Sequence, residues 1–539
     1  MTQNKSEVFS EEGKEKVHGQ TDVMTTVDLA RDDIVTSAGD GSPSQQGREH
    51  SKVKNDCPDK LNKTMFNRFE SSDDSIYVIK PTAKRYIILI MYGICSMEKS
   101  FQWINLSSIT NKVSRYYGVD NIAVNWTSVL FMMTFIPLVL PTSWLIERIG
   151  LRKAVLFGSG GLTLGAIIKC FSCGQDRFYI VIIGQIFVSL SEQFIFCIPA
   201  RIASVWFPDH QVSLATGFGI FGNQCGIALG FLIPPALLEG LETREEIGVG
   251  LYHLFLHTAI VGVATMIVLV FLFEDSPKYA PGNARLLKKL EEARLTEIQR
   301  SFYTELREFG SVLKELIKDH NCKLLIVAFG INIGSGYAIQ TLLNQLVTSS
   351  DFENSNLITG KAGLLIIFCG MVGALFWGHL CDLTHRYIMI NKILYVGVIT
   401  SLILFGLTLR WNDVWALYGA SSLLGFFMIG YNAVGLDTIV ELTYPAPELV
   451  STSVMNLSPQ VFGIGITFLS SALVDEYKSD AAITFLVCVL TVGLIGTYMV
   501  RETLARQIAV KETREERERI DGKHSPTTIS NIQSSYTNC

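Results

Sequence analysis

Charge is scarce in this sequence, and that scarcity excludes several classes of protein. Asp, Glu, Lys and Arg together make up 18% of the 539 residues, whereas apolar residues make up 48%. The net charge of −5 offers no basic surface for nucleic acid. No nucleophile–base pair, phosphate-binding loop or cluster of metal ligands stands out in the sequence. We therefore predict no catalytic residues, no metal, no cofactor and no enzymatic activity.

A disulfide framework is also missing, although the chain has eleven cysteines. Most of them lie inside apolar runs, where cysteine behaves as a small apolar side chain: Cys95, Cys197, Cys225, Cys369 and Cys488. Cys170 and Cys173 have CxxC spacing, but no βαβ pattern and no second pair accompany them. A structural role is favoured over a metal or redox role.

What the sequence does have is apolar runs of about twenty residues, the length that a helix needs to cross a bilayer. Lipid offers no hydrogen-bond partners to the backbone, so such runs must be helical. We predict an all-α membrane protein of twelve transmembrane helices in two six-helix bundles. The predicted spans are 86–109, 124–146, 153–171, 178–204, 213–238, 250–273, 322–348, 360–380, 389–409, 414–442, 449–473 and 482–500.

The polar segments divide the chain into five parts. Residues 1–84 lack apolar periodicity and are predicted to be a disordered cytosolic tail, without a visible signal peptide. Residues 85–273 and 322–501 form the two predicted bundles. Between them, residues 274–321 have apolar side chains at helical spacing among balanced charges, which predicts a cytosolic amphipathic linker rather than a partner-binding or lipid-sensing element. Residues 502–539 are predicted to be a second cytosolic tail.

Basic residues in the short loops predict the orientation. With the first tail inside, the inner loops hold Arg148, Arg152, Lys153, Arg386 and Lys392, and the outer loops are rich in Asp and Glu. Both termini are then cytosolic. We expect a monomeric, multi-pass protein of the plasma membrane, with an intracellular organelle membrane as the alternative. A glycosylation sequon at Asn125 lies beside a predicted span, and its occupancy is left open.

The two predicted halves echo each other after their second spans. One loop carries an acid followed by basic residues at Glu147, Arg148 and Arg152, and the other at Asp382 and Arg386. This pattern resembles the motif that marks the major facilitator superfamily. An acid there can cap a helix N-terminus and pair with Arg across the bundle. We predict that these five residues form a latch that holds one transport state.

A second echo follows the fourth and tenth spans. Gln224 lies sixteen residues after Pro208, and Gln460 lies fifteen residues after Pro445. Repeats related by an axis along the membrane normal are typical of major facilitator transporters. We therefore predict that Gln224 and Gln460 face each other across a central cavity.

These stretches, together with the segments 100–104 (SFQWI), 199–207 (PARIASVWF) and 341–345 (TLLNQ), resemble the feline leukaemia virus subgroup C receptor-related family. The resemblance covers residues 85–501. It implies a facilitative carrier of choline and ethanolamine, and the family has also been described as haem exporters and importers. The family's cation-binding and cavity residues fall here on Trp103, Tyr337, Gln224, Gln460 and Met132. Pro459 stands where the family usually has Ala before the second glutamine.

The residue types fit a small quaternary ammonium ion, which has no N–H to donate. An aromatic face attracts such a cation through its quadrupole, by about 0.5–2 kcal/mol per desolvated contact. Trp103 and Tyr337 could form two walls, while the amide of Gln224 or Gln460 binds a hydroxyl. A cage of neutral residues needs no co-ion, so we expect uniport by alternating access.

Three charged residues depart from the family pattern: Glu98, Lys99 and Glu192. Facing the cavity, an acid among them would add cation attraction or proton coupling; paired with neighbours, it would be structural. Both interpretations stay open. Haem transport is the alternative function, with His253 and His257 as possible ligands near an exit. A cell-surface receptor without transport is the third alternative.

Overall fold

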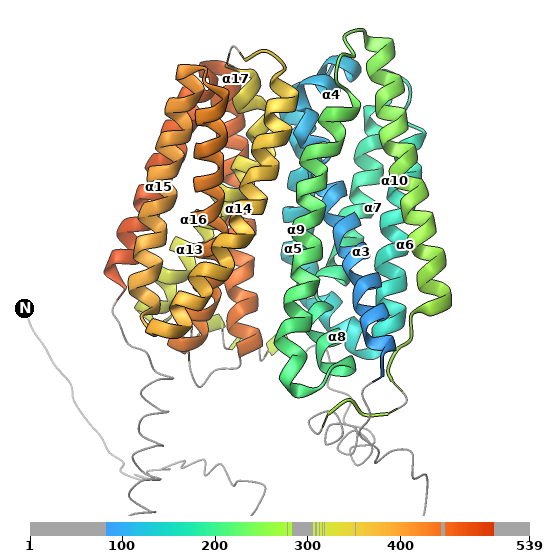
Figure 1. The fold of residues 1–539 in the computed structure, drawn as a ribbon, viewed down its shortest axis with the longest axis vertical. Helices are drawn as coiled ribbons and strands as arrows, with labels where there is room; N and C mark the ends of the chain where they lie inside the picture. The colour runs from blue at the N-terminus through green and yellow to red at the C-terminus, as the bar shows by residue number, and fades with distance from the viewer. Residues whose placement is uncertain are drawn as a thin grey trace, which may run out of the picture. The chain divides into compact units, whose positions relative to one another are not determined.

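The computed structural model is built from long α-helices joined by short connections (Figure 1). It describes residues 82–277, 279–282, 306–307, 310–311, 313–314, 316, 318–350, 352–443 and 448–500. The predicted tails and most of the predicted linker lie outside these residues. All the described residues belong to one unit of the chain, residues 73–539.

The described helices fall into two groups along the chain. The first half consists of α3 (Lys84–Ile104), η2 (Ser107–Ile109), α4 (Thr110–Tyr117), α5 (Asn121–Ile149), α6 (Leu151–Cys170), α7 (Phe178–Phe196), α8 (Pro199–Trp206), η3 (Asp209–Gln211), α9 (Val212–Leu237) and α10 (Arg244–Leu272). The second half consists of α13 (His320–Thr348), α14 (Ser355–Thr384), α15 (Tyr387–Trp411), α16 (Val414–Thr443) and α17 (Glu448–Met499).

Ten helices in the described part of the chain are long and apolar enough to cross a membrane. The last of them, α17, has 52 residues and a non-helical backbone at Lys478, so it holds two crossings. The helix α3 is not among the ten, but its 21 residues reach about 31 Å at 1.5 Å per residue. With these two additions, the helices are consistent with the twelve predicted spans, and the predicted all-α membrane fold is confirmed.

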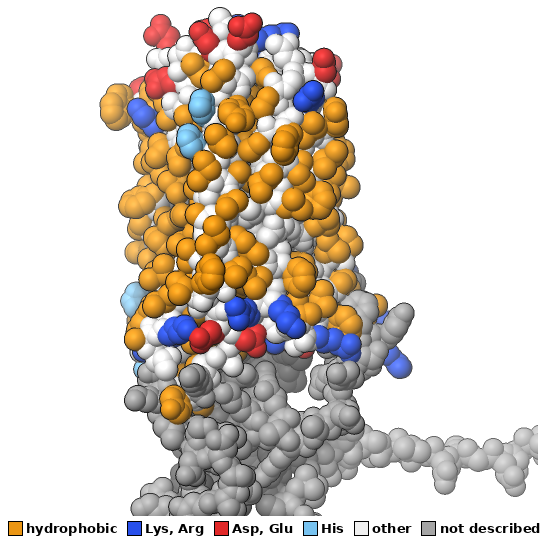
Figure 2. Space-filling model, turned by 90° about the vertical axis from the view of Figure 1, so that its right-hand side faces the viewer, with side chains coloured by type: hydrophobic (Ala, Val, Ile, Leu, Met, Phe, Trp, Pro, Cys, Tyr) orange, Lys and Arg blue, Asp and Glu red, His pale blue; other side chains and the backbone are white. Residues whose placement is uncertain are grey.

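One face of the molecule, on the side of α10 and α6, is apolar in the middle and charged at both ends (Figure 2). Large apolar side chains also stand outward along α10, α14 and α16; Phe271, Leu375 and Trp415 are 79%, 77% and 82% exposed. In water such a surface would be costly, whereas in lipid it contacts hydrocarbon. The apolar band is therefore the membrane-facing surface.

The two halves repeat the same packing. In the first half α3 packs on α9 and α5 on α7; in the second half α13 packs on α17 and α14 on α16. The halves meet where α9 packs on α14 and α5 on α17. Each half thus supplies its second and fifth membrane-crossing helices to the interface: α5 and α9 from the first half, α14 and the first part of α17 from the second. We call the two ends of the bundle the α4 end and the α8 end (Figure 1).

Two predicted spans are interrupted in the structure. The span 86–109 ends as an α-helix at Ile104 and is followed by the 3-10 turn η2. Near this break Ser108 Oγ donates to the Asn105 carbonyl, and Thr110 Oγ1 to the Ser107 carbonyl, both at 3.0 Å. The span 178–204 breaks between α7 and α8, where Pro199 occupies the first turn of α8. The first break follows Trp103 directly.

Candidate functional site

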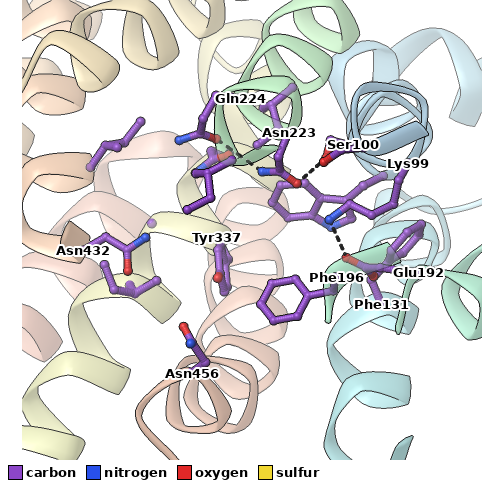
Figure 3. Close-up of a pocket in the computed structure, with 18 of the residues that line it drawn as sticks. Lys99, Ser100, Phe131, Glu192, Phe196, Asn223, Gln224, Tyr337, Asn432 and Asn456 are labelled. Atoms are coloured by element: carbon purple, nitrogen blue, oxygen red, sulfur yellow. Dashed lines mark hydrogen bonds and ion pairs between the residues drawn. The ribbon is translucent and has the colours of Figure 1, made fainter. Parts of the chain in front are cut away.

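A cavity of about 330 Å³ lies between the two halves. All five residues predicted to bind substrate line it, each from a different helix: Trp103 from α3, Met132 from α5, Gln224 from α9, Tyr337 from α13 and Gln460 from α17. Figure 3 shows Gln224 and Tyr337 among the side chains around this space. Pro199, the first residue of α8, also lines the cavity, so the cavity extends toward the α8 end.

Two aromatic rings meet across the interface between the halves. The ring centroids of Trp103 and Tyr337 are 5.8 Å apart, and the ring planes are inclined at 85°. Both side chains are half-buried. Because α3 ends one residue after Trp103, the indole lies at a break in its helix, a feature that transporters use near their binding sites. The rings thus contact each other edge to face, and both residues line the cavity.

Amides form a polar part of the lining. Ser100 Oγ donates to Asn223 Oδ1 at 2.5 Å, and Asn223 Nδ2 lies 3.5 Å from Gln224 Oε1 (Figure 3). Asn432 and Asn456 line the cavity from the second half. None of the three asparagines was predicted as a site residue, although a polar side chain inside an apolar span is itself a sign of function. Amides both donate and accept, so they can bind a hydroxyl.

Lys99 and Glu192, two of the three charged residues whose role the sequence left open, face the cavity as an ion pair. Lys99 Nζ lies 3.2 Å from Glu192 Oε1, and their side chains are 6% and 14% exposed (Figure 3). The ammonium also lies 5.6 Å from the centroid of the Phe196 ring. Lys99 of α3 therefore pairs with a residue of another helix, Glu192 of α7.

Glu98 does not line this cavity but lies inside the first half. It is 4% exposed, and neither carboxylate oxygen has a hydrogen-bond partner. A second buried charge, Lys169, is fully buried and donates to Gln102 Oε1 at 2.9 Å and Gln185 Oε1 at 3.0 Å. These two charges belong to the interior of the first bundle. Among the described residues that line the cavity, Lys99 and Glu192 are the charged ones.

Polar contacts join the two halves at the α4 end. Asn125 Nδ2 donates to Ser471 Oγ at 2.7 Å, and Asn125 Oδ1 accepts from Gln345 Nε2 at 3.0 Å. Nearby, the Asn111 backbone N–H donates to Asn344 Oδ1 at 3.1 Å. Asn125 is fully buried in this interface, so its amide is inaccessible to glycosylation in this state. These contacts hold the two halves together at the α4 end.

The predicted latch residues lie at the α8 end, and one carboxylate there was missed. Asp275 Oδ1 accepts from the Arg152 backbone N–H at 2.9 Å, so Asp275 rather than Glu147 caps α6. Gly150, with φ of 86°, leaves room for that carboxylate, since a Cβ would lie 2.8 Å from it. The Arg152 guanidinium donates to the Val270 carbonyl at 2.8 Å. Both contacts stay within the first half.

The other latch residues lie on α5, at the end of α14 and just after it. The Arg148 guanidinium lies 4.2 Å from the centroid of the Trp144 ring, in its own helix. Glu147, Asp382 and Arg386 are exposed, and Arg386 lies 3.9 Å from Met389 Sδ. The latch stays a prediction.

The histidine pair considered for haem lies on the outside of the first half. His253 and His257 are exposed on α10, with ring centroids 6.0 Å apart. Neither lines the cavity. Within the described residues, no three His, Cys, Asp or Glu side chains are grouped so that they could hold a metal ion.

Comparison with known proteins identifies the family of this chain. A profile of the Major Facilitator Superfamily matches residues 88–456. The human choline/ethanolamine transporter FLVCR2 is 36% identical over 468 residues, which cover 85% of this chain and 86% of that protein. The choline/ethanolamine transporter FLVCR1 of Felis catus is 32% identical over 426 residues, covering 79% and 74%.

Solved structures share the fold at low sequence identity. A bacterial homologue of the human lysosomal transporter Spinster, in an inward-facing and unoccupied conformation, has a TM-score of 0.61 at 12% identity and covers 79% of this chain and 99% of its own. A D-xylose–proton symporter has a TM-score of 0.59 at 11% identity, covering 78% and 98%. The chain belongs to the major facilitator superfamily and, within it, to the feline leukaemia virus subgroup C receptor-related family of membrane transporters.

Proposed function

We propose that this transporter is a facilitative uniporter of choline and ethanolamine. The observation that carries the proposal is the pair of perpendicular rings, Trp103 and Tyr337, in a small cavity between the halves. A quaternary ammonium ion gains about 0.5–2 kcal/mol from each desolvated aromatic face. Gln224, Gln460 and the neighbouring asparagines can bind the hydroxyl at the other end of the molecule. Met132, which is buried, completes the wall by contact alone.

The charge of the cavity supports uniport. Its two charged lining residues, Lys99 and Glu192, neutralise each other, so substrate binding leaves no acid that requires a co-transported ion. The membrane potential then acts on the substrate's own charge, with about 2.3 kcal/mol per 100 mV. Relatives that bear the name choline/ethanolamine transporter support the same substrates.

The contacts across the α4 end and the cavity's extension toward the α8 end support alternating access, with the α4 end closed. Loop charges orient the α8 end, with both termini, to the cytosol, so the closed α4 end faces outward. The described state is then inward-facing. In the opposite state the α8 end closes, and we propose that Glu147, Arg148, Arg152, Asp382 and Arg386 act as the latch there. The plasma membrane is the proposed location, and a monomer the proposed unit.

Haem is less well supported as a substrate. A cavity of about 330 Å³ is at the small end of ligand sites, which span roughly 300–1,000 Å³. No histidine or cysteine is among its described lining residues, so two common axial ligands are missing. A receptor without transport would not need the cavity at all. An uptake experiment with all three substrates distinguishes both alternatives from choline transport.

The test is the uptake of labelled choline, ethanolamine and haem in one cell line expressing the full chain, normalised to protein at the cell surface. We expect saturable uptake of choline and ethanolamine above that of control cells, unchanged when sodium is removed. Haem uptake alone would support the haem alternative, and uptake of none of the three would support the receptor.

A further inference from the structure

Two facing helices each present one charge and one ring to the cavity. Lys99 and Trp103 lie four residues apart on α3, and Glu192 and Phe196 lie four residues apart on α7. Residues at this spacing lie on the same face of a helix, one turn apart. All four side chains line the cavity, and α3 packs against α7. The cavity therefore has a cation and an anion beside its aromatic walls (Figure 3).

The ion pair is shielded from bulk water but not sealed off from the cavity. Lys99 and Glu192 are 3.2 Å apart and only slightly exposed, and Glu192 is the more exposed of the two. Taking one partner away from a buried pair leaves the other charge without compensation, which is strongly unfavourable. A simple cation that bound Glu192 would leave Lys99 in that condition. A ligand with both charges would compensate both residues at once.

We propose that the Lys99–Glu192 pair is a second recognition element, and that the protein also carries small zwitterionic ammonium carboxylates. The ligand's carboxylate accepts charge-assisted hydrogen bonds from Lys99 Nζ. Its ammonium group lies against Glu192 and the rings of Trp103 and Phe196. This inference rests on the proposed function, since both substrate classes use one cavity. Choline, which has no anionic group, occupies the aromatic walls and leaves the ion pair closed.

The two classes differ in how the membrane potential acts on them. Choline carries one positive charge, and an inside-negative potential draws it in. A zwitterion has no net charge, so the same potential should leave its uptake unchanged. This difference separates the two substrate classes without any substitution.

The experiment uses the purified full-length protein in liposomes, with labelled choline and labelled glycine betaine (trimethylammonioacetate) as probes. The wild type should take up both, and an inside-negative potassium diffusion potential should accelerate choline only. The double variant Lys99→Met/Glu192→Gln removes both charges together. It should lower the ratio of glycine betaine to choline uptake by roughly tenfold or more, because the charge-assisted bonds are lost while the rings remain.

The matched control is another Lys–Glu pair, Lys84 with Glu274, which is more exposed and does not line the cavity. Lys84→Met/Glu274→Gln should leave the ratio unchanged. Choline uptake without uptake or competition by glycine betaine would overturn the inference alone. Glycine betaine uptake without choline uptake would overturn the proposed function alone, and uptake of neither would overturn both. An unchanged ratio in the cavity double variant would show that the pair is only structural.

Discussion

Trp103 is central to the proposed site. It stands at the end of α3, faces Tyr337 across the interface, and contacts the cavity from the first half. Its bulk and its quadrupole would both act on a quaternary ammonium ion. Substitutions that keep one property and remove the other can separate them.

Trp103→Ala should weaken apparent choline affinity by about 2 kcal/mol or more, close to thirtyfold, since the ring and its buried area are lost together. Trp103→Phe should keep part of the affinity, because a weaker π face remains. Trp103→Leu should resemble the alanine variant. The measurement is initial uptake of labelled choline, normalised to surface protein. Trp415→Leu, at a lipid-facing position, is the matched control and should behave as wild type. Equal performance of the Leu and Phe variants at position 103 would mean that Trp103 only packs.

The Lys99–Glu192 pair permits a prediction about stability. Glu192→Gln alone leaves the 5%-exposed Lys99 without its counter-charge. Breaking a buried pair in this way costs about 3–5 kcal/mol, whereas replacing both partners is much less harmful. The midpoint of thermal unfolding in detergent should therefore fall in Glu192→Gln and recover in Lys99→Met/Glu192→Gln. A single variant as stable as the double variant would contradict a coupled pair.

The sequence singled out these charged residues, but it could not predict their partners, for a geometric reason. Consecutive residues of a helix point about 100° apart. Glu98 and Lys99 therefore face different surroundings, one the interior of the first bundle and the other the cavity. The contact between Asn125 and Ser471 could not be predicted either, because the two residues are 346 positions apart in the sequence. Only the docking of the two halves brings them together.

Individual helices were predictable because lipid requires long apolar runs, and the helix interiors match those runs well. Their breaks were not predictable, since hydropathy does not register the 3-10 turn that follows α3 or the proline that begins α8. Close helix contacts also depend on single glycines. A Cβ at Gly425 of α16 would lie 1.9 Å from the Ile366 carbonyl oxygen of α14.

Gly425→Leu should therefore push α14 and α16 apart. Overpacking typically costs about 1–3 kcal/mol, and a clash with backbone should reach the upper part of that range or exceed it. We expect little folded protein at the cell surface and a lower unfolding midpoint for what remains. Gly419→Leu is the control on the same helix, because a Cβ there meets nothing within 4 Å. Similar surface levels of the two variants would argue against close packing at Gly425.

For the molecule as a whole, the internal repeat made the cavity predictable. The repeat predicted that Gln224 and Gln460 face one cavity, and the family resemblance added Trp103, Met132 and Tyr337. All five line one space between the halves. The latch residues lie at one end of the bundle, and their pairing across it stays a prediction. The sequence has to support every state of a transport cycle, whereas one structure shows a single state. Contacts of the opposite state therefore have to be measured in another way.

The central claim is that the cavity carries choline by uniport, and flux across a closed membrane tests it most directly. Purified protein in liposomes should take up labelled choline without sodium. An inside-negative potassium diffusion potential should accelerate this uptake, because each 100 mV contributes about 2.3 kcal/mol per charge. Trp103→Leu should remove most of the accelerated uptake. Strict dependence on sodium, or choline uptake that does not respond to the potential, would contradict the account.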